Sequence, residues 1–155
     1  MPDNSAIRAA RKDKREGKSA STQAGEFVHR EIDRIRKGEH GARSAKQAIA
    51  IGLSEARRAG VKVPAPKKGA VSESTRRSAA RDSEKGRKHT PVSKTRSRAR
   101  VKALKREPTS TVSRRSLSRQ AHRAAMKRTA ADRSAAARKG ARTRKSSRGS
   151  RRSHR

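Results

Sequence analysis

The stretch Ser44–Gly60, SAKQAIAIGLSEARRAG, carries the signals of an α-helix at its start, along its length and at its end. Ser44 and Gln47 match a capping box, in which the serine hydroxyl accepts the Gln47 amide proton and the Gln47 side chain reaches back. Gly60 suits the residue that follows a helix, and Pro64 prevents continuation. Between these ends the apolar residues recur at helical spacing and form a stripe that faces a core: Ala45, Ala48, Ile49, Leu53 and Ala56.

A second helical pattern precedes this stretch and ends at Gly38. Its apolar residues are Phe27, Val28, Ile32 and Ile35, again at helical spacing. Two short amphipathic helices joined by a turn predict an αα-hairpin over residues 25–63, with both apolar stripes as its core. Ile51 lies off the second stripe, which indicates a homodimer formed through the hairpin, the docking of another helix, or simply an exposed isoleucine.

Most of the charge follows the hairpin. Residues 1–60 hold 14 Lys and Arg against 8 Asp and Glu, whereas residues 61–155 hold 32 against 5. Large apolar side chains are too sparse after residue 63 to offset the entropy of ordering the chain. We therefore expect a mostly disordered protein with a small all-α element. A basic arm (1–24) precedes the hairpin, and a disordered Arg/Lys/Ser/Ala-rich tail (64–155) follows it, in which residues 95–107 and 116–139 become helical on binding.

A polycation of this density is expected to bind the polyanion that cells hold in quantity, nucleic acid. Arginine outnumbers lysine 30 to 16, which suits bidentate phosphate contacts. Because Phe27 is the only aromatic residue, stacking on unpaired bases has little support, and nonspecific binding of duplex DNA is favoured over RNA. The candidate contacts are Arg76, Arg77, Arg96, Arg98, Arg100, Lys102, Arg114, Arg115, Arg119, Arg123, Lys127, Arg128, Arg138, Lys139, Arg142 and Arg144.

Two alternatives to DNA binding stay open for the whole chain. One is an RNA- or ribosome-associated basic protein. The other is an adaptor that binds a partner through the hairpin, with the tail attracted to acidic proteins or anionic lipid.

The hairpin offers further candidate contacts with nucleic acid. Arg43, Ser44 and Lys46 at the start of the second helix can hold one phosphate. As a helix-turn-helix, the second helix would present Lys46, Gln47, Ser54, Arg57 and Arg58 to the major groove, although such domains usually pack a third helix. The turn Gly38-Glu39-His40-Gly41 imitates the GxxG loop of KH domains, but that fold needs strands that the sequence does not predict.

The sequence predicts no catalytic centre, no metal site and no cofactor. His29 and Asp33 are four residues apart, but they lie among arginines and read best as a surface pair. The sequence contains no cysteine, which leaves out disulfides and thiolate ligands, and no nucleophile–base pair or phosphate-binding loop occurs. The longest apolar run, Ala48–Leu53, is too short to span a bilayer, so no membrane insertion is expected and the protein should be cytoplasmic and nucleoid-associated.

The motif KQAIAIGLSEARRAG at Lys46–Gly60 resembles the signature of an uncharacterised family of small basic bacterial proteins. Its members carry this type of helix after a Gly/Ser-containing turn and often end in basic tails. The resemblance covers residues 25–64 and implies a bacterial source and a domain type, without a mechanism. The tail is separately similar in composition to the tails of linker histones and histone-like proteins, but its preference for arginine departs from their lysine-rich pattern.

Overall fold

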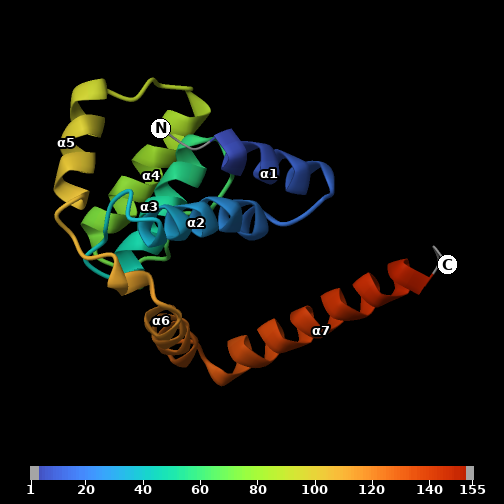
Figure 1. The fold of residues 1–155 in the computed structure, drawn as a ribbon. Helices are drawn as coiled ribbons and strands as arrows, with labels where there is room; N and C mark the ends of the chain where they lie inside the picture. The colour runs from blue at the N-terminus through green and yellow to red at the C-terminus, as the bar shows by residue number, and fades with distance from the viewer. Residues whose placement is uncertain (1–3, 153–155) are drawn as a thin grey trace. The chain divides into compact units, whose positions relative to one another are not determined.

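The structure is a computed structural model that describes the backbone of residues 4–152 and the side chains of residues 4–142 and 144. The described chain is largely helical, so the expectation of a mostly disordered protein is wrong. Its elements, labelled in Figure 1, are α1 (Asn4–Arg15), α2 (Ala20–Arg36), α3 (Ala45–Arg58), α4 (Glu73–Arg87), α5 (Lys94–Leu104), a 3-10 turn η1 (Ser110–Val112), α6 (Arg114–Met126) and α7 (Ala130–Arg152).

Serine and threonine residues that look like low-complexity filler begin most of these helices. Ser19, Ser44, Ser72 and Ser93 are the N-caps of α2 to α5, and each hydroxyl accepts the amide proton three residues later. Thr129 does the same for Asp132 in α7, with 3.1 Å between Asp132 N and Thr129 Oγ1. Each cap satisfies an amide that the first turn leaves without a partner, so helices start where the composition alone suggests a disordered tail.

The capping box of α3 is confirmed in its first half and shifted in its second. Gln47 N lies 3.2 Å from Ser44 Oγ, as expected. The Gln47 side chain reaches back one residue further than in the standard motif, because its Oε1 accepts the backbone proton of Arg43 at 2.6 Å.

Left-handed residues end the first four helices. Gly17, Gly38 and Gly60 follow α1, α2 and α3 with φ of 70°, 77° and 87°, where a side chain would be strained. His89 takes this place after α4, with φ of 49°.

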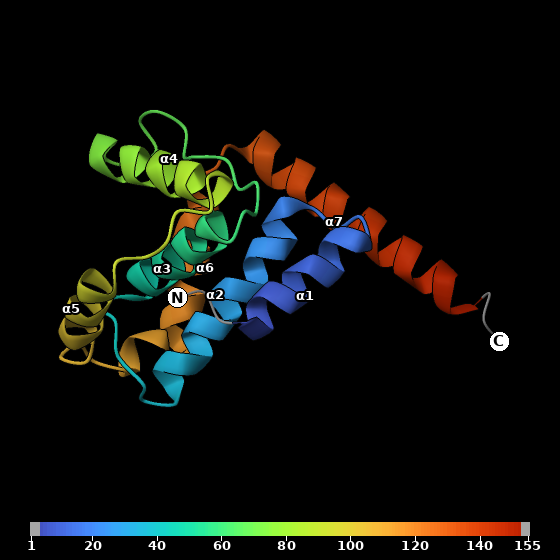
Figure 2. The ribbon, with the colours of Figure 1, turned by 90° about the horizontal axis from the view of Figure 1, so that it is seen from above.

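One hydrophobic cluster joins α1 to the hairpin. Ala6 and Ala10 of α1 pack with Ala24 and Phe27 of α2 and with Ala56 of α3. Figure 2 shows α1 and α2 side by side. The described residues of this segment, 4–24, are therefore packed into the fold, where the sequence led us to expect a basic arm that merely precedes the hairpin.

A second cluster brings in a residue from far along the chain. Ile32, Ile35, Ala42 and Ala48 pack against Val112 of η1, which is fully buried. Ile49, expected at the centre of the α3 stripe, is only half-buried and belongs to neither cluster. Apart from Arg57, the buried residues of α3 are small: Ala45, Ala48, Gly52 and Ala56.

Glycines allow the helices to approach closely. A Cβ on Gly52 would lie 2.6 Å from Val28 Cα, so α3 crosses α2 at this position. A Cβ on Gly86 would collide with the backbone carbonyl of Arg57, so α4 crosses α3 there. These close contacts replace the large apolar side chains that the sequence lacks.

The segment 104–112 is tied to the turn between α2 and α3. The backbone N–H of Gly41 donates to Leu104 O at 2.9 Å, and that of Ala42 donates to Pro108 O at 3.1 Å. The guanidinium of Arg36 adds two hydrogen bonds to Val112 O, both at 3.3 Å. Residues 1–117 therefore form one compact unit, which includes most of the segment expected to be disordered.

The remaining residues form a second unit, Ser118–Arg155, which contains most of α6 and all of α7. The single helix expected over 116–139 is thus two helices. Residues 127–129 separate them, and the last of these, Thr129, begins the capping motif Thr129-Ala130-Ala131-Asp132 that starts α7. The helix expected over 95–107 runs from Lys94 to Leu104. Within residues 4–152 we find no helix with the length and apolar character needed to cross a bilayer.

Candidate nucleic-acid interface

The basic side chains of α5 and the start of α6 lie in solvent. Every described lysine and arginine from Lys94 to Arg144 is exposed. Among the described residues, no carboxylate lies within the 4.0 Å of an ion pair from any basic group of α5 or α6. The candidate contacts that share this setting are Arg96, Arg98, Arg100, Lys102, Arg114, Arg115, Arg119 and Arg123.

The second unit also presents exposed cations. Lys127 and Arg128 are exposed in the break between α6 and α7, and Arg138, Lys139, Arg142 and Arg144 are exposed on α7. Asp132, in the first turn of α7, is the only acidic residue of residues 118–155. It accepts a proton from the Thr129 hydroxyl at 2.8 Å, so its described hydrogen bonds serve the helix start.

Two of the proposed contacts are already paired. Arg76 makes a bidentate pair with Glu73, with Nη2 at 2.7 Å and Nε at 2.9 Å from its oxygens. Arg77 Nε lies 3.4 Å from the same carboxylate. The hydrogen bonds of Arg76 lower the pKa of Glu73, so this carboxylate stays charged and competes with phosphate for both arginines.

Some groups of the phosphate site proposed at the start of α3 already have partners within the protein. The Ser44 hydroxyl caps α3, and the Arg43 N–H is bound by Gln47. Arg43 also has its Nε 3.8 Å from a Glu107 oxygen, although its side chain is largely exposed. Lys46 is exposed and remains available to an anion.

The helix-turn-helix alternative loses most of its proposed groove contacts. Arg57 is 6% exposed and donates from Nη2 to Pro64 O at 3.1 Å. Ser54 and Arg58 both bind Asp82 of α4. Because α2 covers one side of α3 and α4 covers another, α3 is a central packing helix and does not present a free face to a groove.

The turn that imitates a GxxG loop is also built into the core. His40 is 4% exposed, Glu39 pairs with Arg34 at 3.1 Å, and Gly41 lies directly against the backbone of Glu107 and Pro108. A side chain on Gly41 would collide with that backbone, so the glycine serves packing.

A buried polar cluster lies behind this turn. Arg34 Nη1 is 3.4 Å from Glu31 Oε2 and 3.7 Å from Glu55 Oε1, and His40 Nε2 is 3.5 Å from Glu31 Oε1. Glu31 is 1% exposed, and its Oε1 has no hydrogen-bond partner. Burial raises the pKa of Glu31 and of Glu55, and the neighbouring His40 and Arg34 oppose this rise.

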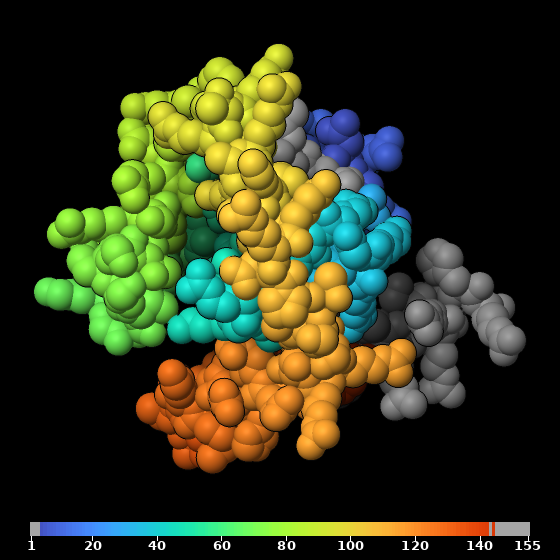
Figure 3. Space-filling model, turned by 60° about the vertical axis from the view of Figure 1, so that its left-hand side comes forward, coloured from blue at the N-terminus to red at the C-terminus, as the bar shows by residue number. Residues whose placement is uncertain are grey.

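The cluster forms one end of a pocket of about 640 Å³ that α2, α3, α4 and α5 enclose. Figure 3 shows the recess between α4 and α5, with atoms of α3 at its floor. Ile51, which the sequence placed off the stripe of α3, is half-buried and lines this pocket. The other end of the pocket holds one carboxylate, Asp82, and five cations: Arg58, Arg81, Lys85, Arg96 and Arg100.

Sequence reasoning missed this pocket, although it named Arg96 and Arg100 individually. Glu31, His40 and Glu55 carried a weak signal, because each is a charged or polar residue beside the apolar positions of a helix or its turn. The participation of Arg81 and Lys85 had no local signal, since it depends on the placement of α4 against α3.

His29 and Asp33, which were considered as metal ligands, form a pair on the surface. His29 Nδ1 lies 3.7 Å from Asp33 Oδ2, and the His29 side chain is largely exposed. Within the described residues, no group of three or more His, Cys, Asp or Glu side chains is arranged to hold a metal ion.

Residues 14–68 match the model of a family of unknown function, DUF6496. The matched segment runs from the end of α1 through α2 and α3 to the residues before α4, and it contains the motif on which the resemblance rested. This part of the chain is therefore an uncharacterised domain. No curated protein and no solved structure matches the chain.

Proposed function

We propose that the protein binds nucleic acid, with duplex DNA as its main ligand and without sequence preference. One observation carries this proposal: residues 94–155 hold 23 Lys and Arg against 2 Asp and Glu, and every described cation among them is exposed. The two acidic residues are Glu107, beside Arg43, and Asp132, at the start of α7. Phosphate groups are the natural partners for cations in this number.

Helix geometry supports backbone contacts over base recognition. A helix of 23 residues such as α7 is about 34 Å long, comparable to one turn of duplex DNA. Phosphate contacts from arginines add affinity and no sequence preference. The side chains that pair with adenine in the major groove, asparagine and glutamine, are rare here: Gln120 is the only one after residue 60.

The experiment measures affinity for a random 25-base-pair duplex by fluorescence anisotropy at several salt concentrations. Each phosphate neutralised contributes about −0.9 to the slope of log K against log salt. Replacing Arg114, Arg115, Arg119 and Arg123 with Gln should therefore make the slope shallower by about 3 to 4.

The matched control replaces Arg8, Arg11, Lys14 and Arg15 of α1 with Gln. These residues are also exposed, and their replacement removes the same charge, but they lie outside the basic segment 94–155. An equal change in both variants would show that only total charge matters and would contradict an interface on α6. Tighter binding to duplex RNA of equal length would contradict the preference for DNA.

A further inference from the structure

The basic end of the pocket holds cations that no carboxylate neutralises. Two other cations of the pocket are already paired. Arg34 lies beside Glu31, Glu39 and Glu55, and Arg58 lies beside Asp82. In contrast, Arg81 has only the Ser78 hydroxyl as a described partner, at 3.1 Å. No described carboxylate lies within 4.0 Å of Lys85, Arg96 or Arg100.

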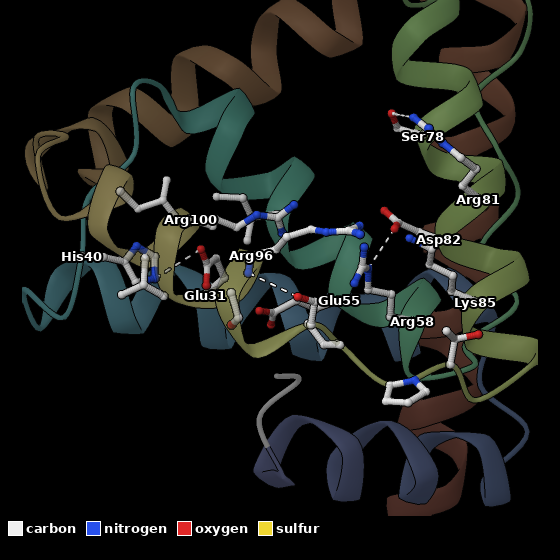
Figure 4. A pocket seen from close by; sticks show the side chains of 18 of the residues that line it. Glu31, His40, Glu55, Arg58, Ser78, Arg81, Asp82, Lys85, Arg96 and Arg100 are labelled. Carbon is white, nitrogen blue, oxygen red and sulfur yellow. Dashed lines mark hydrogen bonds and ion pairs between the residues drawn. The ribbon is translucent and has the colours of Figure 1, made fainter.

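These cations come from opposite walls of the pocket. In Figure 4, Arg96 and Arg100 extend from α5 across the pocket toward Arg58 and Asp82. Arg81 and Lys85 lie on the α4 wall. Like charges gathered in a recess repel each other more strongly than on an open surface, and an anion between them removes this repulsion.

The way α5 is held supports a bridging anion. Leu104 is the only buried residue of α5, and the helix is tied to the fold at that end through Gly41. The first turns of α5, which carry Arg96 and Arg100, have no apolar anchor. An anion bound to both walls would link them to α4.

The acidic end of the pocket requires a different chemical group. Glu31 Oε1 is buried and makes no hydrogen bond, and its described neighbour is His40 Nε2 at 3.5 Å. The described ion-pair partner of Glu55 is Arg34 alone, at 3.7 Å. Carboxylates repel phosphate and accept protons from amino groups. A ligand that satisfies both ends therefore carries a phosphate at one end and hydrogen-bond donors at the other.

Nucleotides have this composition. Guanine, adenine and cytosine each carry an amino group that a carboxylate can bind, whereas uracil carries none. The volume of about 640 Å³ lies within the range of pockets for small ligands. Ile51, Val92 and Val101 line the pocket and offer apolar contacts to a base.

We propose that this pocket binds a nucleotide, with its phosphate among Arg81, Arg96 and Arg100 and its amino-bearing base toward Glu55 and Glu31. The site shares Arg96 and Arg100 with the cations assigned to duplex binding, whereas Arg81, Glu31 and Glu55 belong to the pocket alone. The nucleotide is either free or the phosphorylated end of a strand, since both present the same group.

The test measures binding of GMP, UMP and inorganic phosphate to the full chain by isothermal titration calorimetry at constant ionic strength. The double variant Arg96→Ala/Arg100→Ala should bind GMP at least about tenfold more weakly, because it loses two charged phosphate contacts. Its control is Arg98→Ala/Lys102→Ala, which removes the same charge from the same helix but from residues that do not line the pocket. Equal loss in the two variants would overturn the site.

The base end has its own variant, Glu55→Gln. We expect it to weaken GMP about tenfold and to leave phosphate and UMP unchanged, because an amide cannot accept two protons from one base edge. If wild-type protein binds UMP as tightly as GMP, the assignment of the carboxylates to a base is wrong.

Two oligonucleotides distinguish the source of the nucleotide. A single-stranded tetranucleotide that starts with guanine is compared with and without a 5′-phosphate. If the phosphorylated tetranucleotide binds more tightly than both the unphosphorylated one and GMP, the natural ligand is a strand end. If the phosphorylated tetranucleotide and GMP bind with equal affinity, the natural ligand is the free nucleotide. Duplex binding that survives while GMP binding fails would overturn the pocket site and leave the proposed function standing.

Discussion

Arg58 and Asp82 join α3 to α4, with Arg58 Nε 2.8 Å from Asp82 Oδ1. The other carboxylate oxygen accepts a hydrogen bond from Ser54, one turn earlier on α3. One acidic side chain, itself only 14% exposed, thus holds two residues of the central helix and fixes the wall of the pocket.

The first prediction concerns this contact. Asp82→Ala should lower the free energy of unfolding by about 1.5–3 kcal/mol, because two donors lose their partner in a largely buried place. Urea denaturation of the full chain measures the effect. Glu73→Ala removes an equally short but exposed pair, with Arg76, and should hardly move the midpoint; similar losses in both variants would argue against a structural role of Asp82.

A second prediction separates two glycines within helices. Gly52→Ala should destabilise the protein by about 1–3 kcal/mol, because the new Cβ meets the backbone of Val28. Gly25→Ala in α2 has no atom within 4 Å of the new methyl group and should stabilise by up to about 1 kcal/mol. Opposite shifts of the thermal midpoint are expected, and shifts of the same sign would show that α2 and α3 do not cross at Gly52.

The third prediction follows from the half-buried position of Ile49. Phe27→Ala should cost about 3–5 kcal/mol because Phe27 is fully buried, whereas Ile49→Ala should cost less than about 1.5 kcal/mol. Both are measured by urea denaturation at neutral pH. If Ile49→Ala lowers the free energy of unfolding as much as Phe27→Ala does, Ile49 is a core residue.

The fourth prediction is a pH dependence from Glu31. Because burial raises the pKa of Glu31 in the folded state, the folded protein holds this proton more tightly than the unfolded chain. The stability it contributes is fully present below the unfolded pKa, about 4.3, and is lost as the pH rises through the folded value. The urea midpoint of Glu31→Gln should therefore fall less than that of wild type between pH 4.5 and 7.5.

Glu84→Gln is the control for this measurement. The hydrogen bond and charge of Lys88 lower the pKa of Glu84, so its contribution changes only at more acidic pH. This variant should keep the wild-type slope in the same interval. If Glu31→Gln also keeps it, the carboxylate does not titrate in this range.

The two hairpin helices could be predicted because their signals are local. Ser44, Gly38 and Gly60 mark ends, and Phe27, Ile32 and Ile35 are large enough to show a period. The packing of the other helices into the fold was missed because few large apolar residues mark their buried positions: these are mainly Ala6 and Ala10 in α1, Ala79 and Gly86 in α4, and Leu104 alone in α5. The same capping rule applied to Ser72, Ser93 and Thr129 would have located α4, α5 and α7.

The pairing of cations could not be predicted in the same way. Arg57 and Arg58 are neighbours in sequence, yet one is buried against Pro64 and the other pairs with Asp82. Arg76 and Arg98 lie in stretches of similar composition, but only Arg76 has a glutamate of its own helix within reach. Which arginines are free for an anion depends on tertiary placement and on acidic neighbours, more than on the total charge.

The alanine and glycine packing between α1, α2 and α3 has a calorimetric consequence. A core built from small side chains exposes little apolar surface when it unfolds, and the heat-capacity change of unfolding scales with that surface. Its stability should therefore vary with temperature along a shallow curve, with an unfolding enthalpy that changes little between cold and warm conditions. A leucine-rich helical domain of equal length would show a more sharply curved profile.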